Sequence, residues 1–225
     1  MSGSMIEFGA NERSVAGYLA TPPSGSGPGL IVIQEYWGLV DHIKQVADRF
    51  AEAGFVALAP DLFHGESADG PDDAGRRMMA LDIEAAGADL HGAASHLLGL
   101  PAVAPKKVAA LGFCMGGQLA LSAATAHPEV SAAVDFYGIH PSVSPDFTKL
   151  SGPVLCHFAN RDEFVPEPSA RALVSSIEAA GGDVEAHFYD AGHAFFNDSR
   201  PEAFEASCAA LAWERTLAFL RAHLS

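Results

Sequence analysis

The chain has 225 residues, and 49% of them are hydrophobic, which suits one domain with a complete core. Its 13 basic and 28 acidic side chains give a formal charge of −15, which argues against nucleic acid or an anionic membrane as a partner. We therefore expect a single domain over residues 1–225 that acts on a small molecule, as a monomer or a small homo-oligomer.

The N-terminal segment lacks the basic and apolar regions of a signal peptide, and no apolar run reaches the length of a membrane span. The protein is thus expected in the cytoplasm, where free thiols stay reduced. Residues 1–4 could be a cloning scar ahead of a native Met5. The cysteines are far apart and show no CxxC spacing, so neither a disulfide framework, nor a metal site, nor a cofactor is expected.

Short apolar runs alternate with helical patterns along the chain. The expected strands are Ser14–Ala20, Gly29–Gln34, Phe55–Ala59, Lys107–Leu111, Ser131–Tyr137, Pro153–Phe158 and Val184–Tyr189. The expected helices are Asp41–Ala53, Arg77–Leu98, Gly116–Ala126, Ser169–Ala180 and Pro201–Leu220. This alternation predicts an α/β protein with a mainly parallel central sheet flanked by helices on both faces. In such folds the active site lies at the carboxyl ends of the strands.

The most informative stretch is Gly112-Phe-Cys114-Met-Gly116-Gly117, which follows a predicted strand and opens a predicted helix. A strand, Gly-x-Cys-x-Gly and a helix are typical of a nucleophile elbow with cysteine in the place of serine. The new helix points its free N–H groups and positive dipole end at the sulfur, which favours thiolate. The alternative is a buried structural cysteine beside a glycine-rich turn.

A cysteine nucleophile needs a base, and the base needs an orienting acid. His193 follows the predicted strand Val184–Tyr189 and so lies at a strand's carboxyl end. His140 also follows a predicted strand and remains a competitor. His157 lies inside an apolar strand, which is more typical of a packed core residue.

Asp162 is the preferred acid because it follows the predicted strand Pro153–Phe158. Glu163 is its rival, and a surface turn held by an Arg161–Asp162 pair is the structural alternative. Chain order supports Asp162, since nucleophile, acid and histidine then occur at 114, 162 and 193, which is the order of the α/β-hydrolase fold.

The oxyanion hole of this fold combines the N–H of the residue after the nucleophile with an N–H from another strand-end loop. Met115 takes the first position, and Tyr36, after the predicted strand Gly29–Gln34, is the candidate for the second. Glu35 in the same loop is unusual, because a carboxylate directly after a buried strand is costly without a partner. It is either a solvated loop residue or a carboxylate close to the thiol, which holds the thiol protonated or accepts its proton.

Taken together, these motifs resemble the dienelactone hydrolase family of α/β hydrolases over nearly the whole chain. The matching segments are Gln34-Glu35-Tyr36-Trp37-Gly38-Leu39, Ala59-Pro60-Asp61-Leu62, Gly112-Phe-Cys114-Met-Gly116-Gly117, Phe136-Tyr137-Gly138, Arg161-Asp162-Glu163-Phe164-Val165-Pro166, Gly192-His193-Ala-Phe195 and the closing stretch Ala210–Leu220. The cysteine elbow together with its glutamate is far more specific than a general Gly-x-Ser-x-Gly pattern.

The resemblance implies a triad of Cys114, His193 and Asp162, and a Glu35 that contacts the resting thiol and shifts when substrate binds. The family opens an enol-lactone through an acyl-enzyme thioester. A thiolate suits esters with good leaving groups, because an alkoxide departs less readily than the thiolate and the adduct then collapses back.

The resemblance also bears on substrate contacts. The side chains expected to line the pocket are Tyr137, Phe164, Trp37 and Phe195. Family members that act on the carboxylated dienelactone have an arginine shortly after the catalytic histidine, where this chain has Asn197. A second family arginine corresponds to Arg76 or Arg77, with a surface pair at a helix start as the alternative.

Two other functions stay open at this stage. One is a broad esterase or thioesterase with another physiological substrate, which Asn197 favours. The other is a non-catalytic, redox-sensing protein that uses Cys114 alone. The acid–histidine pair argues against the sensor, because a sensor needs a reactive thiol but no ordered general base.

Overall fold

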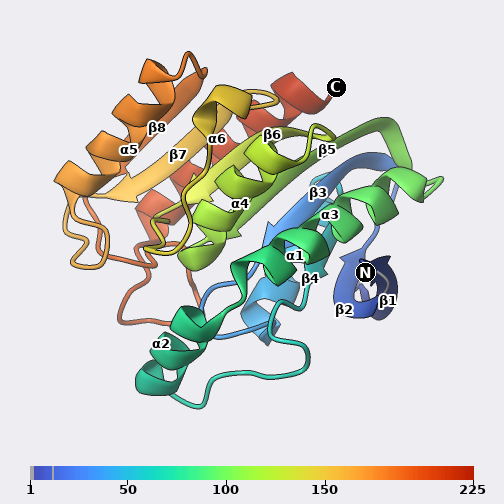
Figure 1. Cartoon of the computed structure of the whole chain (residues 1–225), viewed down its shortest axis with the longest axis horizontal. Coiled ribbons are helices and arrows are strands. Elements are labelled where there is room, and N and C mark those ends of the chain that lie inside the picture. The colour runs from blue at the N-terminus through green and yellow to red at the C-terminus, as the bar shows by residue number, and fades with distance from the viewer. Residues whose placement is uncertain (1–2, 12) are drawn as a thin grey trace.

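An eight-stranded sheet in the order β1-β2-β4-β3-β5-β6-β7-β8 forms the centre of the computed structural model, which describes residues 3–11 and 13–225 (Figure 1). Strands β3 to β8 run parallel to their neighbours, while β2 pairs antiparallel with both β1 and β4. The strands are β1 (Ser4–Ala10), β2 (Arg13–Ala20), β3 (Gly27–Ile33), β4 (Val56–Pro60), β5 (Val103–Phe113), β6 (Val130–Phe136), β7 (Val154–Ala159) and β8 (Val184–Tyr189). The predicted mainly parallel sheet is therefore confirmed.

Helices cover both faces of this sheet, as the apolar strands require. Helices α1 and α6 share one hydrophobic core with the sheet, and α3, α4 and α5 share the core on the opposite face (Figure 1). The helices are α1 (Asp41–Glu52), α2 (Pro71–Ala80), α3 (Ile83–Gly99), α4 (Met115–Ala126), α5 (Glu167–Ala179) and α6 (Ala206–Leu224), with a short 3₁₀ turn at Phe147–Lys149. The parallel connections cross through α-helices, except that from β6 to β7, which holds only the 3₁₀ turn, so both layers follow from the strand–helix alternation.

Strand β3 shows why the inner strands read as continuous apolar runs. Leu30 and Val32 pack into the core on the α1 and α6 side, whereas Ile31 and Ile33 pack into the core on the α3 and α4 side. All four side chains are completely buried. Burying such a side chain contributes about 1.5–3 kcal/mol, so a strand covered on both faces selects apolar residues at every position.

The first strand was missed by the sequence prediction. In β1 only Phe8 and Ala10 are buried, because the strand lies at the sheet edge with its other side chains at least partly in solvent. Ser4 pairs with Leu19, and the N–H of Gly3 donates to Asp48 Oδ1 at 2.7 Å. The interpretation of residues 1–4 as a cloning scar falls partly on residues 1 and 2, which lie outside the described residues.

The prediction of one helix over Arg77–Leu98 is wrong. The segment belongs to two helices, because the chain is extended at Leu81 and Asp82. Asp82 acts as the N-cap of α3, and its side chain accepts a hydrogen bond from the N–H of Ala85 at 3.0 Å. Asp82, which the sequence pattern placed inside one long helix, therefore marks the start of a second helix.

The last helix was also placed too early. It begins at Ala206 rather than at Pro201, and it runs on to Leu224. Residues 201–203 form a turn instead. In the part of the chain that the structure describes, no helix combines the length and the apolar character needed to cross a membrane.

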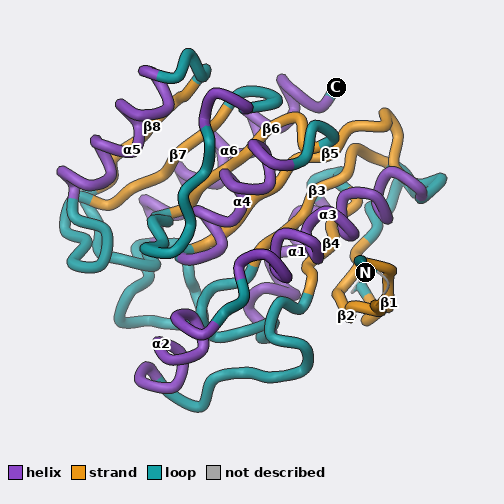
Figure 2. The backbone as a smooth tube through the Cα atoms, in the orientation of Figure 1, coloured by secondary structure: helices purple, strands orange, loops and turns teal. Residues whose placement is uncertain are grey.

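The loops at the carboxyl ends of the parallel strands gather at one end of the molecule, together with α2 (Figures 1 and 2). The register keeps these strand ends in step: Ile33 of β3 pairs with Gly112 of β5, and Phe113 of β5 pairs with Phe136 of β6. Side chains that follow these strands therefore start from the same edge of the sheet.

Candidate active site

Cys114 lies at a sharp turn between the end of β5 and the start of α4. Its backbone has φ 55° and ψ −124°, outside the regions that a non-glycine residue normally adopts. A Cβ on Gly112 would lie 2.0 Å from the carbonyl oxygen of Gly116, and a Cβ on Gly116 would lie 2.5 Å from the carbonyl oxygen of Gln34. The backbone conformation of Cys114 costs about 1–3 kcal/mol and is typical of functional turns.

Asp162 lies in the loop after β7, where its side chain is fully buried. One carboxylate oxygen, Oδ1, accepts the backbone N–H groups of Phe164 and Val165, each at 2.8 Å. The other oxygen, Oδ2, lies 2.8 Å from Nδ1 of His193, which follows β8. The loop therefore fixes the carboxylate so that one oxygen is left for the imidazole.

The pKa of His193 reflects these neighbours. Burial alone would lower it, but the hydrogen bonds with Asp162 and Cys114 and the negative charges of both groups outweigh burial and raise the pKa from its ordinary 6.5 to about 10. The arrangement therefore favours a protonated imidazole at neutral pH.

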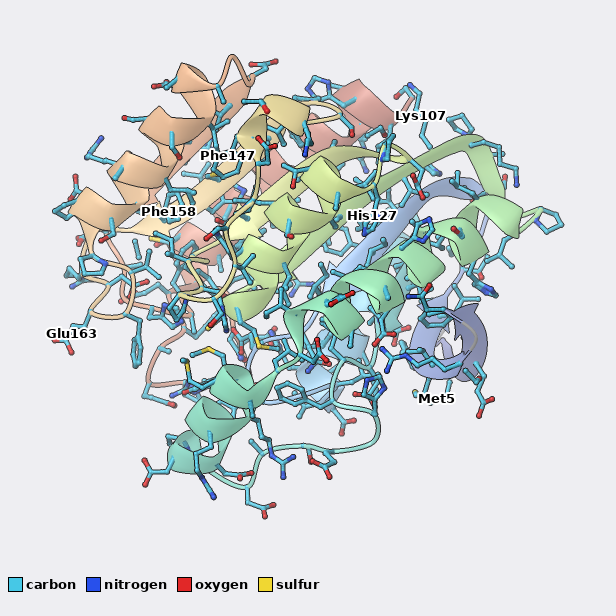
Figure 3. All side chains as sticks on the ribbon, viewed as in Figure 1. Met5, Lys107, His127, Phe147, Phe158 and Glu163 are labelled. Carbon is cyan, nitrogen blue, oxygen red and sulfur yellow. The ribbon has the colours of Figure 1, made fainter. Side chains whose placement is uncertain are left out.

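The rival acid and the surface-turn alternative do not match the structure. Glu163 is exposed and projects from the surface (Figure 3). Arg161 does not pair with Asp162: its guanidinium pairs with Asp190 at 3.1 Å and with Glu205 at 3.4 Å. The interpretation as an Arg161–Asp162 turn is wrong, because the arginine points along the surface while the aspartate is buried.

The two competing histidines are held by structural contacts. His157 is completely buried, with Nδ1 2.8 Å from the Tyr189 hydroxyl and Nε2 3.0 Å from Thr216 Oγ1. Burial lowers the pKa of His157 well below its ordinary value, so the ring stays neutral. His140 accepts the backbone N–H of Ser142 at 3.1 Å and faces the carbonyl oxygen of Met78 at 3.4 Å. Its contacts tie the loop after β6 to α2.

Glu35 is buried rather than solvated, with 3% of its surface exposed. Its Oε2 accepts a hydrogen bond from Nδ2 of Asn197 at 2.8 Å, and its Oε1 accepts one from the Tyr137 hydroxyl at 3.4 Å. Burial raises the pKa of Tyr137 well above its ordinary value, and the nearby Glu35 and Cys114 raise it further. The hydroxyl therefore keeps its proton and donates a hydrogen bond. Glu35 is thus held by two neutral donors.

Met115 and Tyr36 occupy the positions expected of oxyanion-hole donors. Met115 is the first residue of α4, where backbone N–H groups have no partner within the helix. Tyr36 follows Glu35 in the loop after β3. Among the hydrogen bonds of the described residues, neither backbone N–H has a protein acceptor, so both are available to a ligand.

Two aromatic rings contact the imidazole of His193. The Tyr137 ring lies 5.1 Å away in an edge-to-face arrangement, and the Phe164 ring lies 4.9 Å away. Phe164 is 74% exposed and can form a wall of the site, whereas Phe195 is completely buried and packs on Tyr137 as part of the core. The prediction of Phe195 as a pocket wall therefore has no support in the structure.

A groove of about 410 Å³ borders His193 and Phe164. Its other polar lining residues are Arg161, Glu163, Glu202 and Glu205. A second, more apolar hollow of about 310 Å³ is lined by Trp37, Val40, Ala68, Asn197, Ser199 and Arg200. The first hollow carries a surplus of negative charge, with three glutamates and one arginine in its lining.

Neither expected arginine contributes a free guanidinium to this site. Arg77 pairs with Glu66 and with Asp73, the latter at 2.8 Å, and Arg76 pairs with Asp73 at 3.1 Å. Arg77 lines a separate cavity with Arg13 and other residues. The expectation that Arg76 or Arg77 contacts substrate is therefore not supported, because both are engaged by acids on or near α2.

The prediction missed two residues beside the site. Arg200 lies over the Trp37 ring, with 5.3 Å between its guanidinium carbon and the ring centroid, and its positive charge opposes the rise that burial causes in the pKa of Tyr36. Ser199 donates its N–H and its hydroxyl to Asn197 Oδ1, at 3.1 and 2.6 Å. The run Asn197-Asp-Ser199 is a typical side-chain-capped turn, and that pattern could have revealed the Ser199 contacts.

Within the residues that the structure describes, no group of three or more His, Cys, Asp or Glu side chains is arranged to hold a metal ion.

The parallel sheet, the elbow after β5 and the acid and histidine after β7 and β8 define an α/β hydrolase.

Comparisons with known proteins narrow this class. The profile of the dienelactone hydrolase family matches residues 15–224. Protein usf of Aquifex pyrophilus is 37% identical over 99% of this chain and 100% of its own length. An Aquifex aeolicus protein that is provisionally named a carboxymethylenebutenolidase is 34% identical over 99% of each chain. A Klebsiella pneumoniae crystal structure, provisionally described as a dienelactone hydrolase, has a TM-score of 0.87 at 26% identity over 96% of each chain. This chain belongs to the dienelactone hydrolase family, as its motifs predicted.

Proposed function

We propose that the protein opens small lactones or activated esters through a cysteine acyl-enzyme, with Cys114 as nucleophile, His193 as proton shuttle and Asp162 as orienting acid. The observation that carries this proposal is the 2.8 Å contact between the buried Asp162 and Nδ1 of His193, an imidazole whose pKa Asp162 and Cys114 together raise. A histidine held between a buried carboxylate and a thiol is suited to acyl transfer.

In the first half of the reaction, the Cys114 thiolate attacks the carbonyl carbon and forms a C–S bond. The carbonyl electron pair moves to oxygen, and the N–H groups of Met115 and Tyr36 stabilise the oxyanion. When the adduct collapses, the C–O bond to the leaving group breaks, and the His193 imidazolium gives that oxygen its proton. The products of this half are the free enol or alcohol group and a thioester on Cys114.

In the second half, neutral His193 takes a proton from water, and the resulting hydroxide attacks the thioester carbon. The C–S bond breaks, the thiolate is regenerated, and the acid is released. Asp162 holds the imidazole in one tautomer in both halves, because its Oδ2 accepts the Nδ1 proton.

The proposed substrates are neutral or weakly charged esters and lactones with a good leaving group. A relative's name, carboxymethylenebutenolidase, points to a carboxylated lactone. In this chain, however, Asn197 is bonded to Glu35 and the groove beside His193 is lined by Glu163, Glu202 and Glu205. These features favour the second candidate, a broader esterase or thioesterase, because a substrate carboxylate would meet negative charge.

A redox sensor is the third candidate, and the Asp162–His193 pair gives it less support, because a sensor needs no general base. We further propose that the protein acts in the cytoplasm on a small-molecule substrate, as a monomer or small homo-oligomer. The reason is chemical: a thiol nucleophile must stay reduced to work.

The test is steady-state hydrolysis of a panel: cis- and trans-dienelactone, p-nitrophenyl acetate and an acyl thioester. Wild type is compared with Cys114→Ala and with Cys208→Ala, a cysteine outside the site that serves as the matched control. We expect turnover that is lost in Cys114→Ala and kept in Cys208→Ala. Equal activity in Cys114→Ala would refute the cysteine mechanism, and activity on neutral esters alone would identify the broad esterase.

A further inference from the structure

Asp135, near the end of β6, is a buried acid that the proposed mechanism does not use. It is completely buried, although a strand covered on both faces otherwise selects apolar side chains. Its Oδ2 has no hydrogen-bond partner in the part of the chain that the structure describes, and burial raises the pKa of the carboxyl well above its ordinary value. An ionised oxygen left bare in the core would cost far more than a neutral one, so the carboxyl keeps its proton.

The other oxygen of Asp135 holds the turn that follows β6. Oδ1 accepts the backbone N–H of Gly138 at 2.8 Å. Between these two residues lies Tyr137, whose φ is 44° and whose ring contacts the imidazole of His193. The hydrogen bond therefore fastens a strained turn that carries a neighbour of the catalytic histidine.

The same oxygen also packs against the first turn of α4, just after the nucleophile. A Cβ on Gly117 would lie 2.0 Å from Oδ1 of Asp135, and the nearest atom of any other residue, Cα of Gly138, would be 3.1 Å away. The elbow pattern Gly-x-Cys-x-Gly ends at Gly116 and does not itself require a glycine at 117. Close contact with Asp135 explains why this position is a glycine.

The turn after β6 touches the backbone of the elbow as well. A Cβ on Gly138 would lie 2.5 Å from the carbonyl oxygen of Cys114. The N–H of Cys114 donates to the carbonyl oxygen of Phe136 at 3.0 Å. Met115, whose N–H is the proposed oxyanion donor, follows Cys114 directly. The elbow thus rests on the segment that the Asp135 carboxyl holds in place.

We propose that Asp135 is a positioning residue, whose carboxyl oxygen holds the turn after β6 against the elbow and so fixes the Cys114 backbone and the Tyr137 ring for the reaction. This inference deepens the proposed function and rests on Cys114 being the nucleophile. Asp135 has no part in bond making or proton transfer and acts through the two backbone segments that it contacts. A misplacement of about 1 Å can slow such a reaction by about 100-fold, so a shifted elbow should lower kcat more than it raises KM.

The test compares kcat and KM for p-nitrophenyl acetate in wild type, Asp135→Ala and Asp135→Asn. Asparagine keeps a carbonyl oxygen for the N–H of Gly138 and has no charge, like the protonated carboxyl, so Asp135→Asn should stay within about threefold of wild type. Asp135→Ala removes the acceptor and should lower kcat by about 10- to 100-fold, with KM within about threefold. A wild-type kcat in Asp135→Ala, or an equal loss in both variants, would overturn the proposal.

Asp89→Ala separates positioning from a general loss of stability. Asp89 is also completely buried, but it lies on α3 and pairs with Arg13 of β2 at 2.7 Å. Its replacement should destabilise the fold and still leave kcat within about threefold of wild type, at a temperature where circular dichroism shows every variant to be folded. If Asp89→Ala loses as much kcat as Asp135→Ala, general loosening accounts for both losses and the proposal fails.

A double-variant cycle tests the contact between Asp135 and Gly117. Gly117→Ala should lower kcat, because its Cβ would lie 2.0 Å from Oδ1. In the Asp135→Ala background that oxygen is gone, so adding Gly117→Ala should cost about threefold or less. Losses that multiply fully would mean that the two residues act independently, against the proposal. If Asp135→Ala does not fold, Asp135→Asn must still keep its kcat and Gly117→Ala must still lose it.

Hydrogen exchange of the backbone amides gives a readout that needs no turnover. Asp135→Ala should speed exchange by about tenfold or more at Gly138, which loses its acceptor, and also at Cys114 and Gly117 in the elbow. Faster exchange at Gly138 alone would overturn the proposal, because the elbow would then keep its place without Asp135. Ester turnover that is absent in wild type, or that survives in Cys114→Ala, refutes the proposed function instead and leaves the exchange rates to decide the role of Asp135.

Discussion

The replacement Asp162→Asn probes the centre of the proposed mechanism with a minimal change of shape. Oδ1 of Asp162 accepts the N–H groups of Phe164 and Val165, each at 2.8 Å, so the asparagine must keep its carbonyl oxygen there. Its NH₂ group then takes the place of Oδ2, which lies 2.8 Å from Nδ1 of His193. Nδ1 must now accept, and the ring proton moves to Nε2, the atom that has to serve the thiol.

This wrong tautomer sets the expected magnitude. Loss of the orienting carboxylate in a serine triad lowers kcat by about 10⁴, which corresponds to about 5.5 kcal/mol of transition-state stabilisation. The pKa of His193 should also fall from about 10 toward its ordinary 6.5, because Asp162 supplies one of the two hydrogen bonds that raise it. In wild type the imidazolium is lost only near pH 10, so activity should decline there and at lower pH in Asp162→Asn.

The assay is kcat/KM for p-nitrophenyl acetate from about pH 5 to pH 11, with Glu163→Gln as the matched control. Glu163 is the adjacent, exposed carboxylate at the groove, and because p-nitrophenyl acetate carries no charge, its replacement should change neither the rate nor the profile. A kcat in Asp162→Asn within about tenfold of wild type, or an unchanged alkaline limb, would refute the assignment of Asp162 as the orienting acid.

Three further outcomes follow from packing and from linkage. Gly112→Ala should inactivate or unfold the protein, because its Cβ would lie 2.0 Å from a backbone oxygen of α4. In the control Gly75→Ala the new Cβ meets nothing within 4 Å. This variant should raise the free energy of unfolding by about 0.5–1 kcal/mol in urea titrations. His157→Leu should lower the free energy of unfolding by about 1–3 kcal/mol, since the Tyr189 and Thr216 hydroxyls each lose one of their hydrogen bonds, and should leave kcat/KM nearly unchanged. The raised pKa of His193 should stabilise the fold by an amount that is fully present below pH 6.5 and is lost as the pH rises through about 10. Urea unfolding across that range should show a smaller loss of stability in Asp162→Asn than in wild type. An equal loss in the two proteins would contradict this link between the His193 pKa and stability.

The parts of the fold that could be predicted from sequence are those in which local pattern and tertiary burial agree. The inner strands were recognised because residues such as Leu30 and Ile31 are buried on opposite faces and are both apolar. The edge strand Ser4–Ala10 was not recognised, because only Phe8 and Ala10 are buried and its exposed positions carry no fixed pattern. Whether an edge strand forms depends more on pairing with its neighbouring strand than on a pattern in its own residues.

The same distinction applies to the site. The order and strand-end positions of Cys114, Asp162 and His193 were readable because the α/β topology brings such positions to one edge. The partner of Asn197 was not readable, because its contact with Glu35 joins residues 162 positions apart in the chain. A motif predicts which residue stands at a position, but only the packed structure decides which neighbour takes its hydrogen bond.

The spacing of the strands also explains why the Tyr137 ring contacts the imidazole of His193. Cys114 follows β5 and His193 follows β8, three strand positions away in the sheet order. Neighbouring strands are about 4.8 Å apart, so the loop that carries His193 must lean roughly 14 Å back across the ends of β7 and β6. On that path the loop passes Asp162, which follows β7, and Tyr137, which follows β6. The backbone of Tyr137 has a positive φ of 44°. The edge-to-face contact of 5.1 Å between Tyr137 and His193, and the hydroxyl that reaches Glu35, place this tyrosine between the base and the buried acid. Through these two contacts Tyr137, whose positive φ is a costly backbone conformation, links a residue that follows β8 to one that follows β3 at the same edge of the sheet.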